Sequence, residues 1–329
     1  MRALITGATG FVGRHLVREL RAHGWECRCL TRNAKKALDL ERLGADIRRG
    51  DVTDHPSISG IAEGVDAVFH LAAYGNVAAV SDEENTKMHR VNVDGTANVL
   101  AECAGKPISR FVHFSSTAAL GCTGRNCIDE TALCRPLTAY QRSKFESEKV
   151  VSEFWLRDLV PAVIVRPCMI YGPGSGQGAF LKFCRMFKRG VFPRLPGRVL
   201  VPMVHVKDVV AGAIAAFERG VPGETYLMAG SRPVSIHDLR RWVVDALDVS
   251  PPYVWMPGAA LMVAAWGVET VYRVLRRDPP VTLANVRMTL SSRQFNTGKA
   301  EREIGFVSSV DPEEGVRETV RYFVDEGLL

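Results

Sequence analysis

The stretch TGATGFVG, residues 6–13, decides the fold predicted for this chain. It follows the apolar segment RALIT and leads into a segment whose apolar residues have helical spacing. Its glycines, Gly7, Gly10 and Gly13, let the backbone approach a pyrophosphate closely, and the start of the helix offers unpaired N–H groups with a partial positive charge. The stretch therefore predicts a dinucleotide-binding turn between a first strand and a first helix. The alternative is a glycine-rich turn that binds no ligand.

Strand-like and helix-like segments alternate along the chain as far as about Gly174. Further strands are predicted within residues 26–32, 46–54, 66–73, 110–120 and 161–174, and further helices over residues 91–104 and 139–155. The segment 66–73 is apolar almost throughout, which is typical of a strand buried on both faces. The alternation predicts an α/β fold with a doubly wound parallel sheet of the Rossmann kind.

A domain boundary is predicted near Gly174, where the alternation weakens. Residues 1–174 are expected to form the dinucleotide-binding Rossmann domain, and residues 175–329 mainly a smaller C-terminal substrate-binding lobe. Residues 204–220 have the pattern of one more strand and helix, so residues 200–230 are expected to return to the sheet.

Composition and charge exclude several classes of protein. The 329 residues are 47% hydrophobic, which excludes a long disordered chain, and the formal charge of +6 suits a phosphate-bearing ligand or an acidic membrane better than nucleic acid. The N-terminus reads as a strand rather than a signal peptide, which predicts a cytoplasmic location and reduced cysteines. Cys122, Cys127 and Cys134 lack the spacing of a zinc site, and no histidine lies among them, so no metal is predicted.

The end of the second strand bears on the choice of dinucleotide. An acidic residue there usually binds the hydroxyls of the adenosine ribose. This chain has Thr31 at that place, followed by Arg32, whose cation favours the 2′-phosphate of NADP. NADP is therefore predicted, with NAD possible if Arg32 is only a solvated surface residue. Asp51 and Val52, after the third strand, are predicted either to border the adenine or to form a plain turn.

The segment TAYQRSK, residues 138–144, places Tyr140 and Lys144 on one face of a predicted helix. A free phenol has a pKa of about 10, too high for a base at neutral pH. A neighbouring ammonium group and an oxidised nicotinamide would both lower this pKa, so that the phenol could exchange a proton with an alcohol or a ketone during hydride transfer. Ser115, Ser116 and Thr117 on the preceding strand are candidates to hold the substrate oxygen. A Tyr and a Lys four residues apart most often lie on an ordinary helix surface. Here they follow the glycine-rich turn and the serine-bearing strand in this order, which makes the signal strong.

Together these motifs resemble those of the extended short-chain dehydrogenases/reductases, on the epimerase/dehydratase side of that superfamily. The matching stretches are TGATGFVG, GDVTD, VFHLAA, NVDGT, SSTAALG, YQRSK, RPCMIYGPG and VHVKDVV, which cover nearly the whole length. The resemblance implies that Ser116, five residues before Gly121, is the catalytic hydroxyl, that Tyr140 is the acid/base, and that Lys144 binds the nicotinamide ribose and tunes the tyrosine. His70 is expected in the core. The predicted cofactor-binding residues are Gly7, Thr9, Gly10, Phe11, Val12, Gly13, Arg32, Asp51, Val52, Leu71, Ala72, Ala73, Asn92, Tyr140, Lys144, Pro167 and Ile170.

Two departures from the family pattern bear on the substrate. The sugar-nucleotide dehydratases of this superfamily have Asp-Glu directly after the catalytic hydroxyl, where this chain has Thr117–Ala118. Many sugar-nucleotide enzymes carry Arg-Asp before the VHV strand, where this chain has Val201–Pro202, although Arg287 or Arg293 could serve instead. With the apolar C-terminal lobe, these absences make the chain look more like hydroxysteroid or sterol dehydrogenases and dihydroflavonol-type reductases.

The C-terminal lobe contains an uncharged run from Val249 to Val268, followed by arginines up to residue 277. Three prolines interrupt the run, so it is a poor membrane-spanning helix. A peripheral membrane contact through residues 253–277, or a roof over an apolar pocket, is predicted, with a helix packed on its own domain as the alternative. Its predicted apolar stripe consists of Leu261, Ala265, Val268, Tyr272 and Leu275. A basic stretch at residues 182–198 is either a substrate loop or a solvated surface.

Three functions are compatible with these motifs. The favoured one is an NADP(H)-dependent oxidoreductase that moves a hydride between the nicotinamide and a secondary alcohol or ketone of an apolar, sterol- or steroid-like substrate. Its catalytic set is Ser116, Tyr140 and Lys144. The alternative is a nucleotide-sugar 4-epimerase that uses the same Tyr and Lys, and the least favoured is a non-catalytic NADP-binding protein. A small-molecule substrate, a homodimer and no nucleic-acid partner are expected.

Overall fold

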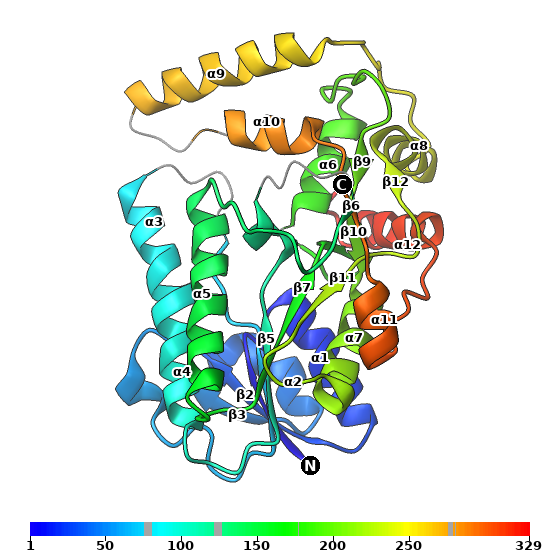
Figure 1. The fold of residues 1–329 in the computed structure, drawn as a ribbon. Coiled ribbons are helices and arrows are strands. Elements are labelled where there is room, and N and C mark those ends of the chain that lie inside the picture. Colours follow the sequence, from blue (N-terminus) through cyan, green and yellow to red (C-terminus); the bar gives the residue numbers. More distant parts are fainter. Residues whose placement is uncertain (76–80, 122–126, 177, 276–278, 280) are drawn as a thin grey trace.

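A seven-stranded parallel sheet forms the centre of the molecule in the computed structural model, which describes residues 1–75, 81–121, 127–176, 178–275, 279 and 281–329 (Figure 1). Cys122, Arg276 and Arg277 lie outside these residues. The strand order is β11-β7-β5-β4-β1-β2-β3, so successive strands run outward from β1 in both directions. This order confirms the predicted doubly wound sheet, and it places a crevice at the carboxyl ends of β1 and β4. The strands are β1 (Arg2–Thr6), β2 (Glu26–Thr31), β3 (Asp46–Arg49), β4 (Ala67–His70), β5 (Arg110–Phe114), β7 (Ala162–Pro167) and β11 (Thr225–Met228).

Helices cover both faces of the sheet, as Figure 1 shows. Alternate residues of each strand enter different cores: Ile5 packs in the cluster that contains α1 and α7, whereas Leu4 packs in the cluster that contains α4 and α5. Because both faces are covered, all four residues of β4 are buried, which explains its apolar sequence. The predicted helix at residues 91–104 is longer, since α3 continues through a π-helical turn at Arg90–Asp94 into α4. The helices of these layers are α1 (Phe11–Ala22), α3 (Asp82–His89), α4 (Gly95–Cys103), α5 (Ala139–Leu156), α7 (Val206–Arg219) and α11 (Gly298–Ile304), and the short α2 (Leu38–Arg42) follows β2.

The remaining helices form a smaller lobe beyond the carboxyl ends of the strands. α6 (Ala179–Lys188), α8 (Ile236–Ala246) and α12 (Pro312–Asp325) share a third buried cluster of apolar residues. α9 (Gly258–Val274) crosses the end of the molecule, and α10 (Leu283–Leu290) lies beneath it (Figure 1). In the part of the chain that the structure describes, no helix is both long and apolar enough to cross a membrane.

The segment 204–220 differs in part from the prediction. β10 (Met203–His205) pairs with β8 (Met169–Tyr171) outside the central sheet, and β11 further along the chain is the strand that joins β7. Both segments are short and apolar, so the sequence pattern alone does not separate them. β11 completes the sheet because α7 and α11 bury its side chains. Two further short pairs join β9 (Leu200–Val201) to β12 (Val234–Ser235) and β6 (Cys127–Ile128) to β13 (Gln294–Phe295).

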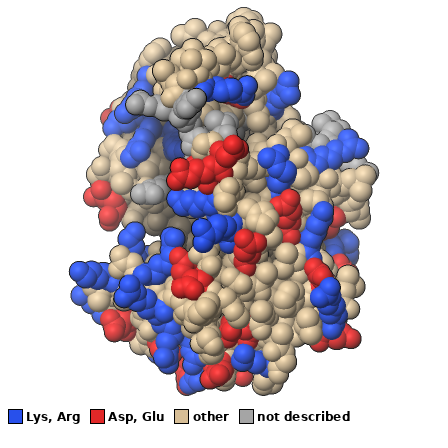
Figure 2. Space-filling view, turned by 90° about the vertical axis from the view of Figure 1, so that its left-hand side faces the viewer, with Lys and Arg blue, Asp and Glu red and all other residues tan. Residues whose placement is uncertain are grey.

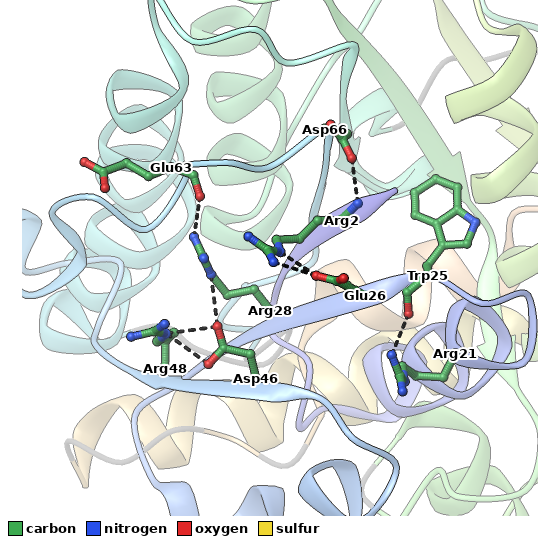
Figure 3. Close-up of polar contacts among 9 residues, drawn as sticks. All are labelled: Arg2, Arg21, Trp25, Glu26, Arg28, Asp46, Arg48, Glu63 and Asp66. Atoms are coloured by element: carbon green, nitrogen blue, oxygen red, sulfur yellow. Dashed lines mark hydrogen bonds and ion pairs between the residues drawn. The ribbon is translucent and has the colours of Figure 1, made fainter.

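The amino ends of the strands carry a group of polar contacts, which Figure 3 shows. Arg2 donates to Glu26 across β1 and β2, and its backbone N–H donates to Asp66 at 2.7 Å. Asp46 on β3 accepts from Arg28 and from Arg48. Exposed ion pairs of this kind contribute at most about 1 kcal/mol each. They occupy the amino ends of the strands, opposite to the crevice at the carboxyl ends.

Candidate active site

The glycine-rich turn connects β1 to α1 with very little space around its backbone. Gly7 has φ +69°, and a Cβ on it would lie 2.8 Å from the backbone nitrogen of Ala72. A Cβ on Gly13 would lie 2.3 Å from the Gly7 oxygen. α1 starts after Gly10 without a side-chain cap, so the N–H groups of its first turn are directed toward the crevice. The turn therefore has the geometry that binds a pyrophosphate.

A cavity of about 610 Å³ opens over this turn. The predicted residues that line it are Gly7, Thr9, Gly10, Arg32, Asp51, Val52, Leu71, Ala72 and Ala73. Residues that the sequence analysis did not assign to cofactor binding also line it, namely Leu30, Thr31, Asn33, Lys36, Gly50 and Val91. Its position at the ends of β1, β2 and β4, with the uncapped start of α1 at one side, fits a dinucleotide.

The far end of the cavity is cationic. Arg32 is 72% exposed and lies 4.0 Å from Asp51, too far for a strong ion pair. Thr53 donates to Asp51 from both its backbone and its hydroxyl at 3.0 Å, which fixes that carboxylate. Lys36 is exposed at the same mouth. Arg32 and Lys36 thus place two cations where the adenosine ribose would lie, and no motif in the sequence distinguishes Lys36 from its neighbour Lys35.

Tyr140 lies in the first turn of α5, which begins with a capping box between Thr138 and Gln141. The hydroxyl of Ser116 accepts a hydrogen bond from the Ala118 N–H at 3.1 Å, and it lies close enough to Tyr140 to lower the pKa of the phenol. Of the hydroxyls considered from the sequence, Ser116 is thus the one beside the phenol.

The other two hydroxyls are used elsewhere. Ser115 donates to Glu148 at 2.5 Å, and Glu148 binds Arg166 through both carboxylate oxygens. Thr117 is buried, and its side chain lies close enough to the Cys168 thiol to lower the pKa of that thiol. The buried Glu148–Arg166 pair joins α5 to β7, so it holds the helix that carries Tyr140 against the strand ends.

Lys144 is 4% exposed, and its ammonium donates to the Phe114 carbonyl oxygen at 2.9 Å. Burial lowers the pKa of Lys144 to about 8, although Glu148 opposes this change. Burial also raises the pKa of Tyr140, and the Ser116 hydroxyl lowers it only in part. Desolvation thus outweighs the favourable contact of the phenol, and the expectation that Lys144 and an oxidised nicotinamide together lower the phenol pKa stays a prediction.

Two neutral histidines lie under Lys144. His70 bonds Thr6 at 2.8 Å and Thr96 at 3.0 Å, and its ring stacks on His113. Burial, with a smaller contribution from Lys144, lowers the pKa of His70 to about 3. His70 therefore belongs to the core, as the sequence predicted, and it adds no positive charge beneath the lysine.

Comparison with known families supplies the identity of this fold and site. The model of the NAD dependent epimerase/dehydratase family matches residues 3–229. The chain belongs to this family. It is 28% identical to sterol demethylase protein B of Methylococcus capsulatus over the full length of both chains. It is 30% identical to 4-hydroxy-2-methyl-3-oxo-4-farnesyl-3,4-dihydroquinoline-1-oxide ketoreductase of Stigmatella aurantiaca over 96% of this chain and 95% of the relative.

A solved structure agrees with the fold. The UDP-glucuronic acid 4-epimerase of Bacillus cereus, in complex with NAD, matches with a TM-score of 0.76 over 99% of each chain at 20% identity. The predicted membership of the extended short-chain dehydrogenases/reductases is confirmed. The chain is an enzyme of the NAD dependent epimerase/dehydratase family, and its cavity and glycine-rich turn fit a nicotinamide dinucleotide.

Some predicted cofactor residues of this family member do not line the cavity. Phe11 and Val12 lie in the first turn of α1, and Gly13 packs beneath Gly7. Asn92 is buried with its amide bonded to Tyr74 and to Ser143, so it connects the β4 loop to α5. Tyr140 and Lys144 of α5 do not line the cavity either, and the last two are Pro167 at the end of β7 and Ile170 in β8.

The sequence analysis did not single out Gly75, which lies near the catalytic set. A Cβ on Gly75 would lie 3.3 Å from the Tyr140 ring, so the backbone after β4 lies against the phenol. Arg293 is half-buried, and its charge acts on the Cys168 thiol, whose pKa burial nonetheless raises to about 12. No motif marks Gly75 in the sequence, whereas Arg293 was named there as a residue that could bind a diphosphate. The described residues contain no group of His, Cys, Asp and Glu that could hold a metal.

Proposed function

We propose that this enzyme is an NADP(H)-dependent oxidoreductase acting on a secondary alcohol or ketone of an apolar, sterol- or steroid-like substrate. The observation that carries the proposal is the proximity of the Ser116 hydroxyl to the Tyr140 phenol, with the buried Lys144 one turn further along α5. These groups follow the strands that border the dinucleotide cavity. They are also the groups that a proton transfer to or from a substrate oxygen requires.

The dinucleotide would be held by the chain in three places. The Gly7–Gly13 turn and the start of α1 would bind the pyrophosphate. Arg32 and Lys36 would bind a 2′-phosphate, which favours NADP, and NAD remains the alternative. Lys144 would bind the nicotinamide ribose. When bound, the nicotinamide would supply or accept the hydride.

The side chains would move the proton. Ser116 would hold the substrate oxygen, and Tyr140 would donate its proton to a ketone or accept one from an alcohol. Because burial raises the pKa of Tyr140, the phenol is protonated at neutral pH and is ready to act as the acid. In the other direction a phenolate must form, and the charge of Lys144 would stabilise it. At pH 7 Lys144 is mostly charged, since its pKa is about 8.

An apolar substrate is supported by the chain's own residues and by the names of its relatives. The positions that hold Asp-Glu in sugar-nucleotide dehydratases are Thr117–Ala118, and Thr117 is buried against Cys168. The relatives include a sterol demethylase protein and a farnesyl quinoline-oxide ketoreductase. Four further predictions from the sequence stay proposals. They are a homodimer, a cytoplasmic location, a domain boundary near residue 174 and a membrane contact through residues 253–277.

A nucleotide-sugar 4-epimerase is the second candidate. Arg293 favours it, because this half-buried cation lies near Cys168, just beyond the catalytic set, and could bind a diphosphate. A non-catalytic NADP-binding role remains the least favoured.

Nicotinamide absorbance separates the candidates. Incubation of the enzyme with NADPH and an apolar ketone, such as a 3-ketosteroid, should consume NADPH. The proposal would be contradicted in favour of the epimerase if none of the apolar ketones caused NADPH consumption and the enzyme interconverted UDP-sugars without a net change in absorbance. Tyr140→Phe serves as the control in both assays.

A further inference from the structure

The outer side of α9 is apolar and lacks a partner in the described part of the chain. Val263, Trp266, Val271 and Val274 recur at helical spacing and are 67%, 62%, 56% and 79% exposed. The stripe predicted from the sequence is only partly buried: Ala265 is buried, whereas Leu275 is not. α9 therefore has two apolar sides, of which one packs toward α10 and the other faces outward.

The basic segment Lys188–Arg198 lies next to the start of α9. The Arg194 N–H donates to the Val254 oxygen at 2.8 Å, and the Met256 N–H donates to the Arg194 oxygen at 3.0 Å. Trp255, between these contacts, is 60% exposed. The segment carries four exposed cations, Lys188, Arg189, Arg194 and Arg198, and no acid occurs in the sequence from Leu159 to Lys207.

The acid of α9 is turned away from this outer side. Glu269 accepts from the Leu283 N–H of α10 at 2.8 Å and pairs with Arg273, so its charge is neutralised toward the protein. Figure 2 shows that the upper end of the molecule, where α9 lies in Figure 1, is largely an uncharged cap, and that basic and acidic residues both occur on the visible side below it. We call the docking face the outer side of α9, residues 254–255 and the segment Lys188–Arg198.

We propose that the docking face rests on the surface of an anionic lipid bilayer, with α9 lying in the plane of the interface. Apolar side chains with tryptophans and adjacent cations are the combination that an interfacial helix needs. The sequence predicts either a substrate loop or a solvated surface for the basic stretch. In the structure, its residues Lys188–Arg198 lie next to the start of α9 and form one surface with it. The cations distinguish this occupant from a second copy of the chain, because the same positively charged face would repel itself.

α10 links the docking face to the catalytic helix. Its Leu283 is held by Glu269 of α9, and Gln141 of α5, next to Tyr140, donates to the Met288 sulfur at 2.9 Å. A bilayer under α9 would therefore lie on the side of the catalytic set that α10 covers. This consequence rests on the proposed function, since only an apolar substrate would pass from the bilayer to the site.

Flotation with vesicles tests the docking face in the full-length enzyme. Vesicles of phosphatidylcholine with phosphatidylserine should carry wild type upward at low salt, and binding should fade at high salt. Each cation near an anionic surface contributes about fivefold to binding. Arg189→Glu with Arg194→Glu should therefore weaken binding at least about 25-fold, and Trp266→Ser with Val271→Ser should also release the protein. The matched controls Arg42→Glu and Val307→Ser change an exposed cation and an exposed apolar residue elsewhere and should bind as wild type does.

Three results would overturn the proposal. They are absence of wild-type flotation with phosphatidylserine vesicles, equal binding to neutral vesicles at all salt concentrations, and paired variants that bind as wild type does. Concentration-dependent dimerisation that Trp266→Ser abolishes, without vesicle binding, would assign the face to a second copy and overturn it as well. Tyr140→Phe keeps the outcomes separate, because it should bind vesicles normally whether or not the proposed reaction is correct.

Discussion

Replacing Lys144 by methionine should stabilise the fold while impairing the enzyme. Burial lowers the pKa of this lysine from 10.5 to about 8. A difference of about 2.5 pKa units corresponds to roughly 3 kcal/mol by which the charged form is disfavoured in the folded state. Methionine keeps the apolar stem and removes the charge. The lost hydrogen bond to the Phe114 oxygen offsets about 1 kcal/mol. We therefore expect Lys144→Met to raise the free energy of unfolding at pH 7 by roughly 2 kcal/mol.

The pH dependence makes this expectation specific. Because the folded pKa lies below the unfolded value, the unfolded state binds more protons between pH 8 and 10.5, and the Lys144 contribution to stability rises with pH in that window. From pH 7 to 9 wild type should gain about 1 kcal/mol relative to Lys144→Met. The comparison between the two proteins cancels the buried thiols, such as Cys103, whose pKa burial raises and which act in the opposite direction.

Urea unfolding without added dinucleotide, at pH 7 and pH 9, measures both quantities. Leucine at the same position provides a second apolar variant of similar volume. Equal pH slopes for wild type and Lys144→Met, or a loss of stability at pH 7 in both apolar variants, would show that the ammonium is hydrated rather than buried.

The remaining predictions concern chemistry and cofactor choice. Tyr140→Phe should lower turnover at least about 100-fold while the dinucleotide still binds, and near-normal turnover on the true substrate would refute the acid/base role. Ser116→Ala should cost about fivefold, the equivalent of one hydrogen bond of about 1 kcal/mol, measured as kcat. Arg32→Ala should weaken NADP binding about tenfold in fluorescence titration, and Lys36→Ala somewhat less, with little change for NAD. Arg42→Ala is the matched control, and a wild type that prefers NAD would contradict the assignment.

The sequence predicted the sheet better than the order of its last strands. Glycines at 7, 10 and 13 and the alternation of segments are local signals, and they were sufficient for the parallel sheet and the cavity. The choice between β10 and β11 was not local, because it depends on which apolar strand α7 and α11 bury. Local patterns do not contain that information.

At the site, too, the sequence indicated which residues take part but not the surroundings that set their pKa values. Spacing pointed to Tyr140 and Lys144, and the structure places Tyr140 near Ser116 and the Lys144 ammonium at the Phe114 carbonyl oxygen. Spacing could not give the direction of their pKa shifts, since these depend on burial by distant segments. The two apolar sides of α9 were likewise invisible, because a helix that is apolar nearly all round does not reveal which side is covered.

The positive charge of Lys144 is only partly offset, because the carboxylate of Glu148 is bound by other groups. Glu148 lies one turn after Lys144 and is the carboxylate that raises its pKa, yet both of its oxygens bind Arg166, and Ser115 donates to one of them. The carboxylate is thus committed to the guanidinium, and the histidines beneath are neutral. A phenolate on Tyr140 would offset the positive charge that remains. Desolvation disfavours both the Lys144 ammonium and the ionised form of Tyr140. Attraction between the two charges offsets part of this cost when both are present. The proton of the tyrosine is therefore coupled to the charge of the lysine.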